Sequence, residues 1–263
     1  MTNFLQKRRS VRNFKKTKVS RGILDNLKAI MEEITAEDST VDFVLYENGS
    51  LIGTGLEGYA GYGGVMIHAP HYIALSMINK EDELNILQGG YFLEKLNTKM
   101  VDMDLDTCWI TVDEVEDQKM KSVFGEKGVT IDYLIGFGYG QKKKLFDPEV
   151  TSSRRSIDEI VFQNEIGKNI DLEMLENYGL MEVFSSIRYA PSHKNFQPWR
   201  FVLENAGVTA YMVKSDEDRR SLVDMGVMLF YFEAMMKTLS HPGKWEISLE
   251  DQGDLKKIGY FKL

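Results

Sequence analysis

The sequence predicts an α+β protein built from two related halves. Three observations predict it: segments whose apolar residues recur at helical spacing, short apolar runs bounded by turn residues, and an echo between the first and second parts of the chain. With 263 residues, 43% of them hydrophobic and 27% charged, the chain is long enough to bury a full core. We therefore expect one domain over residues 1–263, with a first half over about 1–150 and a second over about 160–263.

The first half should contain two helices and four strands. An amphipathic helix is predicted where apolar residues fall at helical spacing, at Ile23, Leu24, Leu27, Ile30, Met31 and Ile34. Short apolar runs predict strands over Val41–Tyr46 and His71–Met77, and the first run ends in the turn residues Glu47-Asn48-Gly49. A second helix is expected over Gly90–Leu105, with strands over Cys108–Val112 and Ile131–Gly140.

The second half repeats this mixture. Helices are predicted over Leu175–Tyr189 and Asp224–Leu239, and strands over Phe201–Leu203 and Val208–Val213. Trp109 follows Gly90 by the same number of residues as Trp245 follows Gly226, and Asp42–Leu45 resembles Arg200–Leu203. These echoes indicate a weak internal duplication, and chance similarity between two amphipathic helices is the alternative.

Composition excludes several classes of function. The net charge of −8 disfavours a nucleic-acid binder, because a phosphate backbone would be repelled. Cys108 is the only cysteine, so no intramolecular disulfide forms and a reducing cytoplasm is expected. Met1–Lys7 lacks a signal-peptide core, and the apolar stretch Met225–Met236 is too short to span a bilayer. The sequence has four histidines, namely His68, His71, His193 and His241. None of them is spaced from another as metal ligands usually are, so we expect no metal site.

The most informative stretch is Ala190–Phe201. Two prolines fix the backbone around Ser192, Asn195 and Gln197, which suits polar groups that meet a planar heteroaromatic ligand at set positions. The alternative is a capping loop whose polar groups satisfy their own backbone.

This stretch is similar to the segment APSxxNxQPWxF of the nitroreductase family, and Arg8–Phe14 is similar to the family's opening motif RRSxRxF. The first match rests on Ala190, Pro191, Ser192, Asn195, Gln197, Pro198, Trp199 and Phe201. The family keeps the two motifs close together, whereas here most of the chain separates them. The resemblance implies a three-layer sandwich in which a central, mainly antiparallel sheet is flanked by helices.

Nitroreductases form intertwined homodimers with the flavin at the interface, RRSxR coming from one subunit and PSxxN from the other. A chain with RRSVR in one half and PSHKN in the other resembles that dimer fused into one polypeptide. The resemblance then implies one FMN per chain and a monomer that mimics the family's homodimer.

The resemblance also implies the flavin contacts. Arg8 and Ser10 would donate hydrogen bonds, Arg12 would lie near the pyrimidine edge, and Arg9 stands between them; an exposed basic face is the alternative. On the other side, the resemblance gives the flavin Pro191, Ser192, His193 and Asn195.

Further candidates come from three other segments. Ser153–Val161 resembles the family's C-terminal tail RKxLEEVV, whose cations reach the FMN phosphate, so Arg154 and Arg155 are phosphate candidates and Lys142–Lys144 weaker ones. Thr111 and Val112 fall in a segment that resembles GLxSxWIxGF, whose backbone N–H approaches flavin N5. Gly53–Gly58 matches GxGxxG, the phosphate-binding pattern of dinucleotide folds, but the glycines that follow leave little room for the helix that such a fold needs. A glycine-lined loop near the flavin, which includes Gly63 and Gly64, is therefore favoured.

The leading hypothesis is an FMN enzyme that takes hydride from NAD(P)H and passes it to a small electrophile, such as a nitroaromatic or a quinone. It requires no catalytic side chain, because the cofactor carries the chemistry. Two alternatives stay open: a flavin-binding protein used for storage or sensing, and a structural relative that no longer binds flavin.

Overall fold

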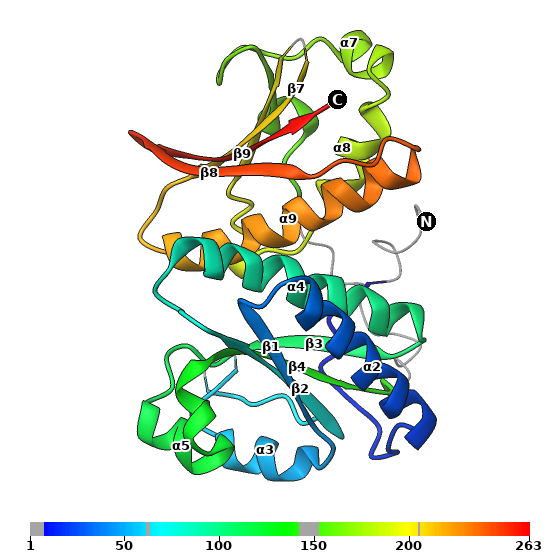
Figure 1. Ribbon diagram of the computed structural model, residues 1–263, viewed down its shortest axis with the longest axis vertical. Coiled ribbons are helices and arrows are strands. Elements are labelled where there is room, and N and C mark those ends of the chain that lie inside the picture. Colours follow the sequence, from blue (N-terminus) through cyan, green and yellow to red (C-terminus); the bar gives the residue numbers. More distant parts are fainter. Residues whose placement is uncertain (1–7, 62–63, 142–152, 205) are drawn as a thin grey trace. The chain divides into compact units, whose positions relative to one another are not determined.

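The computed structural model describes residues 8–61, 64–141, 153–204 and 206–263. The chain divides into two compact units, shown in Figure 1. As far as these residues are described, the N-terminal unit holds Gln6–Asn85 and Lys95–Glu149, and the C-terminal unit holds Ile86–Glu94 and Val150–Leu263. Helix α4 (Glu83–Asp102) therefore contributes residues to both units.

The N-terminal unit is built on a four-stranded antiparallel sheet. Its strands are β1 (Val41–Tyr46), β2 (His71–Met77), β3 (Asp106–Thr111) and β4 (Ile131–Gly138). They lie in the order β1-β2-β4-β3. Leu75 of β2 pairs with Tyr133 of β4 and Cys108 of β3 pairs with Gly136 of β4, so β4 lies between β2 and β3.

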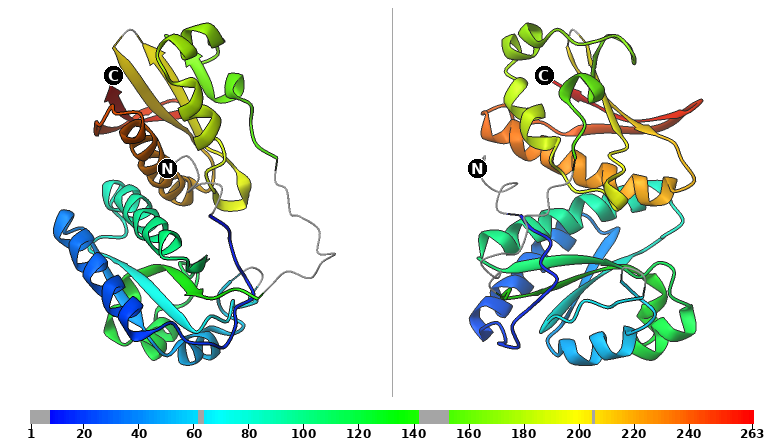
Figure 2. Two further views of the ribbon diagram at one scale, coloured as in Figure 1. Left: turned by 90° about the vertical axis from the view of Figure 1, so that its right-hand side faces the viewer. Right: turned by 180° about the vertical axis from the view of Figure 1, so that it is seen from behind.

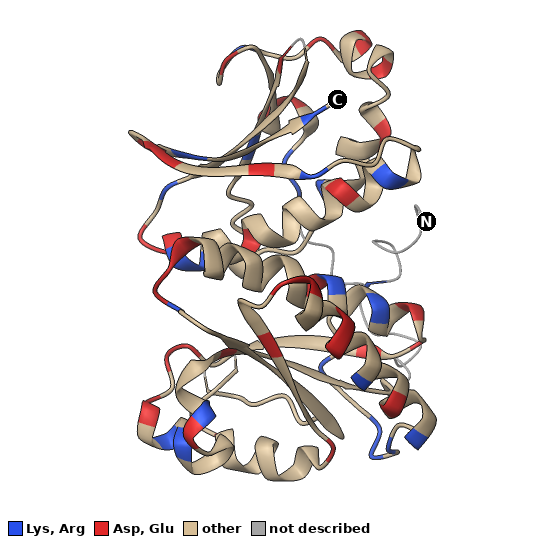
Figure 3. Cartoon of the chain, in the orientation of Figure 1, with Lys and Arg blue, Asp and Glu red and all other residues tan. Residues whose placement is uncertain are grey.

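Helices cover both faces of this sheet. Figures 1 and 2 show α3 (Gly49–Leu56) and α5 (Asp117–Phe124) on one face and α2 (Arg21–Glu37) on the other. A short 3₁₀ helix, η1, spans Glu126–Thr130. Every residue of β4 is buried, as expected for a strand enclosed on both sides. In Figure 3 the strands of this sheet are mostly tan, and most of the charged residues lie on helices and loops.

The start of the glycine-dense segment is a helix, α3, rather than the expected loop, whereas Gly58, Gly61 and Gly64 follow this helix with positive φ angles. Glycine is required at two positions of α3 by close packing: a Cβ on Gly49 would lie 2.2 Å from the Ala69 carbonyl oxygen, and one on Gly53 would lie 2.7 Å from His68 Nδ1. These glycines let the helix approach the chain that enters β2. Of the GxGxxG glycines, Gly53 is accounted for by this packing, whereas Gly58 has no atom within 4 Å of an added Cβ and is favoured by its φ of 79°.

The C-terminal unit is built on a five-stranded sheet. Its strands are β5 (Val161–Gln163), β6 (Trp199–Glu204), β7 (Gly207–Val213), β8 (Trp245–Gln252) and β9 (Leu255–Lys262). They lie in the order β5-β6-β7-β9-β8, and only the β5–β6 pair is parallel. The helices are α6 (Ile157–Ile160), α7 (Leu172–Asn177), α8 (Met181–Ile187), the 3₁₀ turn η2 (His193–Asn195) and α9 (Asp218–Thr238).

Aromatic rings form the core of the C-terminal unit. Phe232 of α9 lies with its ring centroid 4.9 Å from that of Trp245 and 5.0 Å from that of Phe261. Phe184 of α8 and Phe201 of β6 extend the same cluster, with centroids 5.2 Å apart. These contacts fix α9 against the sheet, and α9 in turn carries residues that reach the candidate site.

Within the C-terminal unit, α9 crosses the Ile86–Glu94 part of α4 through two glycines. A Cβ on Gly90 would lie 2.1 Å from the Val223 carbonyl oxygen, and a Cβ on Gly226 would lie 2.0 Å from the Leu87 carbonyl oxygen. Each glycine thus faces the residue three positions before the other glycine. The two helices approach more closely here than any side chain would permit.

The α+β class and the mainly antiparallel pairing are confirmed. The described strands form two sheets, whereas a single central sheet was expected. The predicted helix over Leu175–Tyr189 is two helices, α7 and α8, because Gly179 adopts a φ of 69° between them. Among the described residues, none of the helices is both long and apolar enough to cross a membrane.

Candidate functional site

The segment from Ala190 to Trp199 forms a tight turn between α8 and β6. Left-handed backbone angles occur at Lys194 (φ 48°), Asn195 (φ 58°) and Gln197 (φ 54°). None of these residues is glycine, so each conformation costs about 1 kcal/mol or more. Such a turn persists only when surrounding contacts hold it.

Part of the support is internal to the turn. The Gln197 backbone N–H donates to Ser192 Oγ (3.0 Å), and Gln197 Nε2 donates to the Asn195 carbonyl oxygen (3.2 Å). Gln197 is buried, and its Oε1 accepts from the Arg155 backbone N–H at 2.8 Å. Ser192 and Gln197 therefore satisfy backbone groups locally, as the capping-loop alternative expects.

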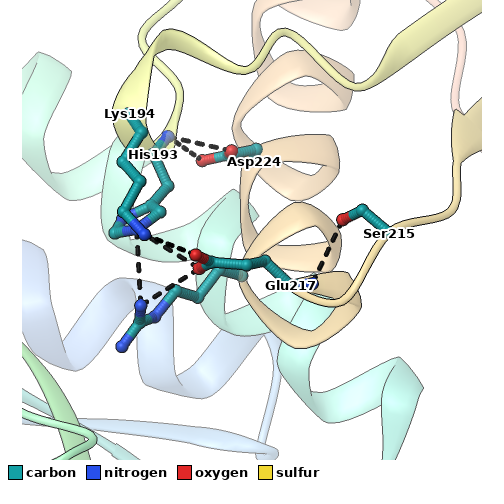
Figure 4. Close-up of polar contacts among 6 residues, drawn as sticks. His193, Lys194, Ser215, Glu217 and Asp224 are labelled. Atoms are coloured by element: carbon teal, nitrogen blue, oxygen red, sulfur yellow. Dashed lines mark hydrogen bonds and ion pairs between the residues drawn. The ribbon is translucent and has the colours of Figure 1, made fainter.

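Helix α9 holds the same turn from another side, as Figure 4 shows. Both carboxylate oxygens of Asp224 accept from the His193 backbone N–H, at 3.1 and 2.9 Å. Glu217, the residue that precedes α9, accepts from Lys194 Nζ at 2.5 Å and lies 3.4 Å from His193 Nε2. The turn is thus attached to α9 through its backbone and through its side chains.

Burial and a neighbouring charge act on Asp224. Desolvation raises the pKa of its carboxyl well above the ordinary value, the His193 N–H opposes that rise, and the negative charge of Glu217 adds to it. The Glu217 carboxyl shows the opposite behaviour: hydrogen bonds from Lys194 and Arg220 lower its pKa.

Arginines from the 153–156 segment lie beside the turn. Arg154 Nη1 donates to Asn195 Oδ1, and Asn195 Nδ2 donates to the Ser153 carbonyl oxygen at 2.9 Å. Arg200 of β6 donates to the carbonyl oxygens of Gln197 (3.2 Å) and Trp199 (2.6 Å). Burial, followed by the positive charge of Arg155, lowers the pKa of Arg200 to about 10. Three arginines therefore contact the turn: Arg154, Arg155 and Arg200.

Arg155 carries a polar atom without a partner. Its Nε is buried and has no hydrogen-bond acceptor among the described residues, and its Nη1 lies 3.8 Å from Glu159. A buried N–H donor of a charged group without an acceptor is costly. An anion bound beside Arg155 would supply that acceptor.

In the N-terminal unit, the RRSVR segment lies along the edge strand β3. Ser10 forms a parallel bridge with Thr107, and the Val11 N–H donates to the Thr107 carbonyl oxygen at 2.9 Å. Phe14 is buried and bridges Gly140, which anchors the arm. Arg9, Ser10 and Arg12 are exposed, and Arg8 is half-buried. The arm thus presents its polar side chains outward from a fixed backbone.

The charges of this arm act on the buried thiol of Cys108. Burial raises the pKa of Cys108, and the positive charges of Arg12 and Arg8 oppose that rise. Both guanidinium groups therefore lie within electrostatic reach of the start of β3. This places two of the predicted flavin cations beside one edge strand.

Val112 has its N–H engaged in the sheet. Its backbone N–H donates to the Asp132 carbonyl oxygen at 2.8 Å, and its side chain is buried in the core beneath α3 and α5. Thr111 pairs with Tyr133. The Val112 donor expected to approach flavin N5 is therefore already paired, which counts against that contact.

The remaining predicted site residues are Gly63, Gly64 and Lys142–Lys144. Gly64 adopts a φ of 81°, and its carbonyl oxygen accepts from the Gly58 N–H at 3.1 Å, so it closes a loop. Gly63 and Lys142–Lys144 lie outside the described residues.

The structure brings the predicted residues together in two sets. Arg154, Arg155, Pro191, Ser192, His193 and Asn195 lie in the C-terminal unit, and Arg8, Arg9, Ser10, Arg12, Gly64, Thr111 and Val112 lie in the N-terminal unit. Sequence reasoning missed Asp224, Glu217 and Arg200. A usable signal existed for the first two, because acidic residues seven apart at the start of an apolar helix share one face.

Comparisons with known proteins concern the family and the fold of the chain. The family model described as "Putative TM nitroreductase" matches residues 1–236. A solved structure of a putative nitroreductase from Thermotoga maritima is 17% identical, with a TM-score of 0.61, over 98% of this chain and 92% of that chain. At this identity the likeness shows the fold alone. A search of curated proteins found no match.

Two further solved structures cover a smaller share of the chain. An FMN-dependent nitroreductase from Clostridium difficile is 20% identical with a TM-score of 0.47, over 57% of this chain and 92% of that chain. The FMN-dependent nitroreductase NfnB from Mycobacterium smegmatis, in complex with NADPH, is 12% identical with a TM-score of 0.44, over 52% of this chain and 86% of that chain.

Proposed function

Because this chain belongs to the nitroreductase family and is an oxidoreductase, we propose that it binds FMN, accepts hydride from NADH or NADPH, and reduces a small electrophile of the nitroaromatic or quinone type. One observation carries the proposal. Asn195 and Arg154, which the resemblance assigns to the same flavin from two different motifs, are hydrogen-bonded to each other.

The residues present fit FMN. The buried Arg155 Nε lacks an acceptor among the described residues, and the positive charge of Arg155 helps to lower the pKa of Arg200, so an anion is favoured there. Arg154 and Arg155 would hold the phosphate. Pro191, Ser192, His193 and Asn195 would line the ring system.

Bound FMN supplies the hydride chemistry. The residues of this chain would bind and orient the FMN. The turn presents a fixed set of backbone and amide groups, and Arg8, Ser10 and Arg12 lie on a backbone that is held by β3. By the resemblance, Arg12 would place positive charge near the pyrimidine edge of the flavin, where it would stabilise negative charge on the ring. No side chain of the chain is assigned a proton transfer.

We also propose that the chain is a fused pseudo-dimer that binds one FMN as a monomer. Two features support it. The order β1-β2-β4-β3 with α4 after β2 recurs as β6-β7-β9-β8 with α9 after β7. The reciprocal contacts of Gly90 with Val223 and of Gly226 with Leu87 are those expected between equivalent helices.

Anaerobic reduction tests the proposed function. Purified protein loaded with FMN is mixed with NADH or NADPH without oxygen, and the visible absorbance of the oxidised flavin is followed. Since ordinary enzymes turn over about 1 to 1,000 times per second, this absorbance should disappear within seconds. Addition of a quinone or nitroaromatic should then restore the oxidised spectrum. A flavin that stays oxidised with both nicotinamides would contradict the reductase proposal.

A second candidate, a flavin-binding protein without reductase activity, is favoured by one observation. The Val112 N–H donates to Asp132, so the donor expected at flavin N5 is engaged elsewhere. Under this candidate FMN binds, but NAD(P)H reduces it no faster than free FMN. Stopped-flow comparison of bound and free FMN separates the two.

A further inference from the structure

We propose that Asp224 is a positioning residue that fixes the His193–Asn195 turn in the conformation that receives the flavin. The flavin part of this inference rests on the proposed function. Asp224 lies on α9 and does not belong to either motif shared with the family, so its role comes from geometry alone.

The contact is specific and directed at the backbone. Both oxygens of Asp224 lie within 3.1 Å of the His193 N–H, the first N–H of the 3₁₀ turn. This bond fixes the orientation of the peptide between Ser192 and His193. It acts directly before the left-handed residues Lys194 and Asn195.

The location of the carboxylate is costly, which argues for a role. Asp224 is 7% exposed, lies among apolar residues of α9, and has the His193 N–H as its only polar partner among the described residues. No described cation neutralises it, and Glu217 repels it. A buried carboxylate with a single N–H partner is unfavourable compared with an apolar residue.

Glu217 completes the attachment from the same face of α9. Positions 217 and 224 are two helical turns apart, so both side chains point toward the turn, as Figure 4 shows. Glu217 holds the side chains of Lys194 and His193, whereas Asp224 holds the backbone. Since Glu217 is more exposed, loss of Asp224 has the larger effect on the conformation of the turn.

Two substitutions separate the acceptor from the charge. Asp224→Asn keeps one oxygen that accepts from the His193 N–H, whereas Asp224→Leu removes both. Met235→Ala is the matched control, because Met235 is fully buried on the same helix, three turns away, and its loss weakens α9 packing without touching the turn.

The first measurement needs no flavin. Amide hydrogen exchange of the peptide that contains His193 is compared across the variants in flavin-free protein. Asp224→Leu should speed exchange there by about tenfold or more, Asp224→Asn by less than about threefold, and Met235→Ala not at all beyond its effect on global stability.

The second measurement is FMN affinity, followed by the quenching of flavin fluorescence. Asp224→Leu should weaken FMN binding by about tenfold or more, whereas Asp224→Asn should retain most of the wild-type affinity. Met235→Ala should lower the midpoint of unfolding but bind FMN with wild-type affinity. Wild-type exchange and wild-type affinity in Asp224→Leu would overturn the inference. If the wild-type protein binds no FMN, the proposed function fails, and the exchange measurement still decides whether Asp224 fixes the turn.

Discussion

At the scale of single residues, the polar groups of the turn act mainly on one another. Ser192 and Gln197 hold the backbone, and Asn195 joins the turn to the 153–156 segment. The sequence motif marked this stretch as the most informative part of the chain. The support of the turn by its own polar groups was expected only under the capping-loop alternative, and the left-handed angles at Lys194, Asn195 and Gln197 were not predicted.

We expect His71 to make the stability of the N-terminal unit depend on pH. Its buried Nε2 accepts from the Val19 N–H at 3.0 Å, and desolvation lowers the pKa of His71 below its ordinary value of about 6.5. Since the folded state prefers the neutral ring, this stabilisation is fully present above about pH 6.5 and is lost as the pH falls through the lowered pKa.

We therefore expect the free energy of unfolding to fall more steeply in wild-type protein than in His71→Gln as the pH is lowered from about 7.5 to about 5.5. Denaturant titrations at several pH values measure both proteins, and carboxyl groups common to both cancel in the difference. Parallel curves for the two proteins would show that His71 does not titrate in this way.

At the scale of elements, local signals predicted some parts of the fold well. β1 and β2 have the predicted bounds because apolar runs end at turn residues. β8 and β9 were missed because charged residues such as Glu246, Glu250 and Lys257 interrupt their apolar residues, and their sheet partners are set by tertiary contacts. α3 was missed because its glycines fit a helix only through the packing against Ala69 and His68.

The crossing of α4 and α9 provides a prediction about stability. A methyl group added at Gly226 would meet the Leu87 carbonyl oxygen at 2.0 Å, and backbone cannot yield as a flexible side chain can. Gly226→Ala should lower the free energy of unfolding by about 1–3 kcal/mol. Urea denaturation measures the change.

Gly22→Ala is the matched control. Gly22 lies in α2 with no atom within 4 Å of its added Cβ, so alanine there should leave stability unchanged or raise it by up to about 1 kcal/mol. Equal effects of the two substitutions would mean that the close approach at Gly226 does not contribute to stability.

At the scale of the whole molecule, we propose from the resemblance that an arm and a turn far apart in the sequence serve one flavin. The resemblance predicted both motifs, and each unit shows its own motif on a supported backbone. The sequence could not predict Asp224 as a support, because a single acidic residue in an apolar helix does not indicate which backbone N–H it meets.

Titration with FMN tests this claim most directly, by stoichiometry and affinity in wild-type protein, in Arg8→Ala with Arg12→Ala, and in Asn195→Ala. We predict one equivalent of FMN per chain, and affinity lowered by about tenfold or more in the double arginine variant and in Asn195→Ala, since each removes charge-assisted or directed hydrogen bonds to the same ligand. Two equivalents per chain, or an affinity that changes in only one of the two variants, would contradict the claim.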